Sequence, residues 1–185
     1  MRKQYMQTGV SERSENTFLR DIQSESGSNL DKDKLIGDEN TINSEDIEFT
    51  GIFFNRNEFY RECDRLNIGV RLASCVRNPH VTVKYKPDIL HKELFGQKAV
   101  FRAIGYANDG VNEGFKVELV SAGKDLEELV KEVPIPHITI SFGKSAKAVN
   151  TRYLDFKPIK PVEFEGVFGG RTYNDKIINT NYSRK

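Results

Sequence analysis

Apolar and polar residues change their pattern near residue 47. From residue 1 to about 46 the chain is rich in Ser, Asn, Asp, Glu and Gln, and its apolar residues are too sparse to bury one face of an element. Ordering such a segment costs more conformational entropy than its burial returns. We therefore predict that residues 1–47 form an acidic N-terminal arm, disordered or partly helical around 16–23, and that residues 48–185 form the folded domain.

Within residues 48–185 two periodicities interleave. Alternation of apolar and polar residues predicts strands, whereas apolar residues three or four positions apart predict helices. Asp109-Gly110, between two such strands, is a hairpin signal. The predicted strands are 48–54, 69–76, 79–85, 99–107, 115–121, 136–142 and 162–173, and the predicted helices are 55–67, 88–95, 124–133 and 146–154. This order predicts an α+β domain with mainly antiparallel strands, without the regular β-α-β-α order of a doubly wound sheet.

Composition and charge limit the possible classes of protein. The chain has 185 residues, of which 37% are hydrophobic and 30% charged. No apolar run approaches the roughly 20 residues of a membrane span, and no apolar core follows the first basic residues. Cys63 and Cys75 are too few for a disulfide framework or a zinc site. We expect a cytoplasmic monomer with reduced thiols, no membrane partner, no metal and no cofactor.

The net charge of +1 hides a difference between the two segments. Residues 1–47 hold 10 acidic and 6 basic residues, and residues 48–185 hold 17 acidic and 22 basic residues. A modest positive excess on the folded segment favours an anionic ligand, although many domains share it.

One sequence motif occurs twice. Pro79-His-Val-Thr-Val recurs as Pro136-His-Ile-Thr-Ile, and the two histidines are 57 residues apart. Because side chains at i and i+2 share one face of a strand, each copy should present an imidazole beside a hydroxyl. His80, Thr82 and Lys84 should share one such face, and His137, Thr139 and Ser141 the other. Tyr85 and Phe142 should then lie in the core.

This pairing suits phosphodiester hydrolysis, which needs a base for the attacking oxygen and an acid for the leaving oxygen. Two histidines can supply both near neutral pH. The threonine hydroxyls can donate hydrogen bonds to the non-bridging phosphate oxygens. The alternative is that both histidines serve only packing on half-buried strands. Two copies matched at five positions, holding two of the three histidines in the chain, favour catalysis.

The duplicated motif resembles the signature of the two-histidine (2H) phosphoesterase superfamily. That group includes LigT-like RNA 2′,3′-cyclic phosphodiesterases, the cyclic phosphodiesterase domains of fungal and plant tRNA ligases, and phage anti-CBASS nucleases. The likeness is greatest to the tRNA-ligase type and spans roughly residues 48–170. It is carried by Phe49-Thr-Gly-Ile-Phe-Phe, Asn78-Pro-His-Val-Thr-Val-Lys-Tyr, Lys116-Val-Glu-Leu-Val, and Pro136-His-Ile-Thr-Ile-Ser-Phe followed by Ala146-Lys-Ala-Val-Asn-Thr.

The resemblance implies a bilobal LigT-like fold, with two mainly antiparallel sheets and flanking helices around a central cleft. By motif position it makes His80 and His137 catalytic and Thr82 and Thr139 the phosphate-binding residues. The expected activity is metal-independent hydrolysis of 2′,3′-cyclic phosphate ends of RNA, as in RNA repair, or of small cyclic nucleotides. The alternatives are a cyclic-oligonucleotide 3′–5′ phosphodiesterase and a non-catalytic RNA- or nucleotide-binding module. Which histidine is the acid, and whether a 2′- or a 3′-phosphate remains, stay open.

Other residues are weaker candidates. Tyr106 or Phe95 could stack on a base, although core packing is the better interpretation of each. Arg171, after Gly169-Gly170, could contact a phosphate at a strand end. His91 is interpreted as a surface histidine, and Cys63 as a buried residue on an apolar helix face.

Overall fold

The computed structural model describes residues 42–68 and 71–180. Nearly all of the acidic arm predicted for residues 1–47, including the helical stretch around 16–23, lies outside the described residues. The arm therefore stays a prediction.

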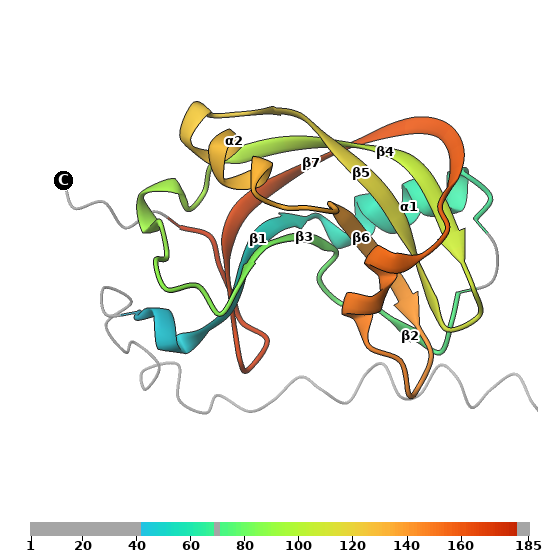
Figure 1. Ribbon diagram of the computed structural model, residues 1–185, viewed down its shortest axis with the longest axis horizontal. Coiled ribbons are helices and arrows are strands. Elements are labelled where there is room, and N and C mark those ends of the chain that lie inside the picture. The colour runs from blue at the N-terminus through green and yellow to red at the C-terminus, as the bar shows by residue number, and fades with distance from the viewer. Residues whose placement is uncertain (1–41, 69–70, 181–185) are drawn as a thin grey trace, which may run out of the picture. The chain divides into compact units, whose positions relative to one another are not determined.

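The described residues form a sheet with two α-helices and short 3-10 turns (Figure 1). The helices are α1 (Arg56–Arg65) and α2 (Lys124–Lys131), and the 3-10 turns are η2 (Ser44–Asp46), η3 (Lys92–Leu94) and η4 (Ala148–Tyr153). The strands are β1 (Ile47–Phe54), β2 (Ser74–Cys75), β3 (His80–Tyr85), β4 (Lys98–Asn108), β5 (Asn112–Ala122), β6 (His137–Phe142), β7 (Lys157–Thr172) and β8 (Ile177–Ile178). None of the helices in the described part of the chain is long and apolar enough to cross a membrane.

Every strand pair is antiparallel, which confirms the α+β class with a mainly antiparallel sheet. The strand order is β2-β6-β5-β4-β7-β1-β3, with β8 also paired to β7. The expectation of two sheets is wrong, because the described strands form one eight-stranded sheet. The long strand β7 joins two parts of the sheet, one formed by β1 and β3 and the other by β4, β5, β6 and β2. It pairs with β4 over residues 157–167 and with β1 over residues 166–172.

Some predicted elements are shorter than the periodicity indicated. The predicted helix 88–95 is only the turn η3, because His91 before it adopts a left-handed conformation with φ +48°. The helix predicted at 146–154 is the six-residue 3-10 helix η4. Of the strand predicted at 69–76, residues 69–70 lie outside the described residues, and the described part is a strand only at Ser74–Cys75. The strand β8 was not predicted.

Local signals explain the elements that carry the core. The Asn55 side chain caps α1 by accepting hydrogen bonds from the backbone N–H groups of Asn57 and Glu58. The helix places Phe59 and Cys63 in the core, both fully buried, as predicted for Cys63. At the β4–β5 hairpin, the Asp109 carboxylate accepts from two backbone N–H groups of the turn, and Gly110 supplies the positive φ that the turn requires.

Each motif strand lies unusually close to a glycine of its neighbour. Thr82 in β3 is paired with Gly51 in β1, and Thr139 in β6 is paired with Gly114 in β5. A Cβ atom at Gly51 would lie 2.6 Å from the Val81 carbonyl oxygen, and one at Gly114 would lie 2.5 Å from the Ile138 carbonyl oxygen. Neither distance leaves room for a side chain.

A β-bulge follows each of these close approaches. On β3 the register moves from Thr82 opposite Gly51 to Lys84 opposite Thr50, so that Val83 is the extra residue. On β6 it moves from Thr139 opposite Gly114 to Ser141 opposite Glu113, so that Ile140 is the extra residue. The sequence repeat thus corresponds to a repeat of backbone structure.

We predict that Gly51→Ala destabilises the domain by about 1–3 kcal/mol, the usual cost of forcing extra volume into a packed site. The matched control is Gly143→Ala, where the nearest atom to the new Cβ would be 3.6 Å away. This control should change the free energy of unfolding by less than about 0.5 kcal/mol. Urea unfolding measures both values, and equal stability of the two variants would contradict the close approach.

Candidate active site

The two motif histidines begin two strands that are not hydrogen-bonded to each other. His80 is the first residue of β3 at one end of the sheet order, and His137 is the first residue of β6, next to the other end. The sheet is curved enough that residues of β3 and β6 come within 8 Å of each other, measured between Cα atoms (Figure 1). His137 also contributes to the electrostatic environment of His80. The tertiary structure therefore brings the two motifs together.

The two imidazoles are held in the same way. His80 Nδ1 lies 2.7 Å from the Asn78 carbonyl oxygen, and His137 Nδ1 lies 2.9 Å from the Ile135 carbonyl oxygen. Because a carbonyl oxygen can only accept, Nδ1 carries the hydrogen in each ring. In the neutral form of each ring, Nε2 is then the nitrogen that is free to accept a proton.

The proline of each motif explains why the same bond forms twice. A residue that precedes proline is restricted to extended conformations. Pro79 and Pro136 therefore fix the backbone of Asn78 and Ile135, whose carbonyls accept from the histidines two positions later.

The surroundings of His80 are mostly aromatic. Its ring stacks on Phe49 at a centroid distance of 4.6 Å and lies 5.7 Å from the ring of Phe53. The pKa of His80 is lowered to about 4, mainly by burial and in smaller part by the positive charge of Arg171, against the opposing effect of the Asn78 carbonyl. His80 is therefore neutral at neutral pH.

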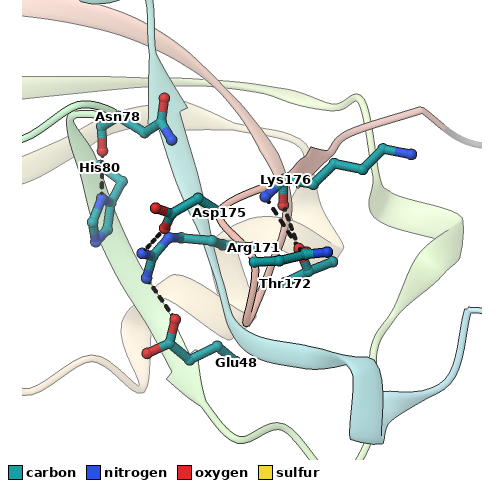
Figure 2. A network of polar contacts seen from close by, with 8 residues as sticks. Glu48, Asn78, His80, Arg171, Thr172, Asp175 and Lys176 are labelled. Atoms are coloured by element: carbon teal, nitrogen blue, oxygen red, sulfur yellow. Dashed lines mark hydrogen bonds and ion pairs between the residues drawn. The ribbon is translucent and has the colours of Figure 1, made fainter. Parts of the chain in front are cut away.

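Arg171 lies beside His80 but is bound to two carboxylates (Figure 2). Its guanidinium donates to Glu48 at 2.5 Å and to Asp175, and its Cζ atom lies 5.4 Å from the centre of the Phe49 ring. Sequence reasoning gave Arg171 only a weak role as a phosphate contact. Because two carboxylates already balance its positive charge, a phosphate would have to compete with them.

The surroundings of His137 are cationic instead. Its cross-strand partner on β5 is Lys116, which is exposed, and directly paired residues point to the same side of a sheet. Burial lowers the pKa of His137, and the charge of Arg152 contributes to the same shift. Neither Lys116 nor Arg152 was predicted, because only the strand register and the position of η4 place them beside this histidine.

The two motif threonines differ in what their hydroxyls bind. Thr82 is half-buried, and its hydroxyl makes no hydrogen bond to other residues in the described part of the chain. Thr139 is buried, and its hydroxyl donates to the Ala148 carbonyl oxygen at 3.0 Å. Its oxygen also lies 3.0 Å from Thr151 Oγ1, and since a hydroxyl has one hydrogen, Thr151 is the donor of that bond. Thr82 is thus free to donate to a ligand, whereas Thr139 must first give up its bond to Ala148.

The two bulges overturn three expectations from strict alternation. Lys84 pairs with Thr50, which faces away from Phe49 and Gly51, so it leaves the face of His80. Tyr85 pairs with Phe49 on the His80 face and is 59% exposed, so its placement in the core is wrong. Ser141 is fully buried, donates to the carboxylate of Glu113 and accepts from the Leu72 N–H, so it is not available to a substrate.

The remaining candidates have structural roles. Tyr106 donates to Glu113 at 2.9 Å, and Phe95 is buried in the core, as the packing interpretation of each predicted. Phe142, placed in the core by alternation, is half-buried. His91 pairs with Glu93 at 3.2 Å and lines a cavity with Lys84, on the opposite face of β3 from His80. In residues 42–68 and 71–180, no three His, Cys, Asp or Glu side chains come together as a possible metal site.

The lowered pKa of His80 predicts how stability depends on pH. Between about pH 6.5 and 4 the unfolded chain protonates this residue and the folded chain does not, so stability falls as the pH falls through this range. His80 contributes up to about 3 kcal/mol to this loss in the free energy of unfolding, and the His80→Gln variant should lack that contribution. Urea unfolding of both proteins at pH 7 and pH 4.5 measures it, and identical losses would contradict the buried neutral state of His80.

A comparison of the whole chain with protein-family models finds no family that matches, and a comparison with curated proteins finds no relative.

Proposed function

We propose that this protein is a phosphodiesterase that hydrolyses 2′,3′-cyclic phosphates by general acid–base catalysis with His80 and His137, without a metal. The observation that carries the proposal is the repeated arrangement of the two histidines. Each begins a strand, each is held through Nδ1 by the carbonyl two residues before it, and the two strands approach each other. Packing alone does not require the same tautomer to be held twice.

The proposed fold is the bilobal LigT-like fold. Its two halves would be β3 with β1 and the second part of β7, and β6 with β5 and β4. Two observations support it: the glycine and the bulge occur at matching positions in both halves, and β7 is shared between them.

In the proposed reaction a water molecule attacks phosphorus opposite the leaving ribose oxygen. His80 takes a proton from this water, because its aromatic surroundings keep it neutral. His137 gives a proton to the departing oxygen. One P–O bond forms and one breaks, which leaves a phosphate monoester and a free hydroxyl. Thr82 donates to a non-bridging oxygen, where negative charge increases in the transition state.

The histidines should be essential for turnover and not for folding. His80→Ala and His137→Ala should each lower kcat by about 10²–10⁴-fold, the usual contribution of a general acid or base. The double variant should be little worse than either single variant, because the two groups act in one step. His91→Ala is the matched control and should keep full activity. Activity should persist in EDTA.

The assay uses a 2′,3′-cyclic mononucleotide, RNA with a cyclic phosphate end, and cyclic di- and trinucleotides. Folded histidine variants that retain turnover on all of them would refute the proposed chemistry. Turnover confined to the cyclic di- and trinucleotides would favour the second-messenger phosphodiesterase, and binding without turnover would favour the binding module.

The pH dependence of kcat/KM should be bell-shaped, with its maximum on the acidic side of pH 6.5. The base must be neutral and the acid protonated, and the pKa values of both histidines are lowered by burial in the free enzyme. The two limbs report the coupled pair and not single residues. A maximum well above pH 7 would contradict the assignment of these two groups.

A further inference from the structure

The two halves of the candidate site differ in charge although their backbones match. At the position opposite the motif histidine, the first half holds Phe53 and the second half holds Lys116. The cation of the first half, Arg171, is bound to two carboxylates. In the second half, Lys116 and Arg152 form no ion pair with any described residue. The free positive charge of the site therefore lies on the side of His137.

Buried polar contacts hold the backbone of η4, which carries Arg152, against the sheet. Asn112 Nδ2 donates to the Lys147 carbonyl oxygen at 2.9 Å and lies 3.4 Å from the Thr151 hydroxyl. Thr139 donates to Ala148 and accepts from Thr151, as described above. Asn112, Thr139 and Thr151 are 2%, 7% and 0% exposed. The backbone of η4 is thus fixed to the strand of the second motif, which keeps the attachment point of the Arg152 side chain beside His137.

The same turn presents an aromatic ring to solvent. Tyr153 is 67% exposed, and the Arg152 Cζ atom lies 4.6 Å from the centre of its ring. A cation over one face of an exposed tyrosine leaves the other face available. Sites for single-stranded nucleic acid combine such features: cations contact the phosphates, and aromatic rings stack on the bases.

We propose that Lys116, Arg152 and Tyr153 form a subsite for the nucleotide next to the reacting phosphate, so that the substrate is the end of a single-stranded RNA. This subsite rests on the proposed function, because the reacting phosphate is placed between His80 and His137. The neighbouring phosphate binds Lys116 and Arg152, and its base stacks on Tyr153. A cyclic mononucleotide has no neighbouring nucleotide, so it lacks this second phosphate and this second base. It fills only the space between the histidines.

The test compares kcat/KM for an oligonucleotide with a 2′,3′-cyclic phosphate end and for the cyclic mononucleotide. The unaltered protein should favour the oligonucleotide at least about tenfold. Lys116→Gln, Arg152→Gln and Tyr153→Ala should each lower this ratio by about 5- to 20-fold, in the range of one phosphate contact or one stacked base. Each removed cation should also reduce the salt dependence of binding by about 0.7 in the slope of log K against log salt. Lys84→Gln, an exposed lysine on the opposite face of β3, is the matched control and should leave the ratio unchanged.

A binding measurement separates the subsite from the reaction. A fluorescent tetranucleotide with a 3′-phosphate is titrated into His80→Ala/His137→Ala protein, with and without Arg152→Gln. Weaker binding on loss of Arg152 supports the subsite even if no substrate is turned over, in which case only the proposed function fails. Unchanged binding and an unchanged kcat/KM ratio in all three variants would overturn the subsite. An equal loss on linear and cyclic oligonucleotides would overturn its assignment to RNA ends.

Discussion

The geometry of the candidate site depends on a close approach between backbones that only glycine permits. Gly51 and Gly114 let the carbonyl oxygens of Val81 and Ile138 come to where a side chain would otherwise start. The extra residue that follows on each motif strand then turns the next side chains to the other face. The histidine and threonine stay on one face, and Lys84 and Ser141 leave it. Each motif therefore keeps its histidine and threonine on one face, where His80, Thr82 and His137 are half-buried and Thr139 is buried beneath η4.

His80 and His137 occupy matching backbone positions, but the residues around them differ in polarity and charge. Phe49 and Phe53 surround the imidazole of His80, which loses hydration and stays neutral. His137 lies beside Lys116 and Arg152, which attract anions. In the proposed reaction this difference matches separate roles, with the neutral His80 as the base and His137 as the acid. In the proposed subsite it would also give a direction to a bound strand, with the neighbouring nucleotide on the cationic side.

The long strand β7 explains how one sheet can carry two similar halves. Its first part belongs to the β4 side and its second part to the β1 side. The curvature of this sheet brings β3 near β6, although β3 lies six places and β6 one place from the β2 edge in the strand order. A break in β7 would separate the halves without changing either motif, so the site depends on a strand that contributes neither histidine.

The sequence by itself determined the α+β class, most strand positions, the capped helix α1, the Asp109-Gly110 hairpin and the pairing of His80 with His137 as candidates. These follow from local periodicity, turn chemistry and a repeat, all of which depend on residues close together in the chain. It could not determine the bulges, and for that reason Tyr85 and Lys84 were assigned to the wrong faces. Only the tertiary structure placed Lys116, Arg152 and Phe49 around the histidines. It also showed that the Thr139 hydroxyl donates a hydrogen bond to the Ala148 carbonyl oxygen. Strand register and the docking of η4 are set by contacts between residues far apart in the chain, and no local pattern contains them.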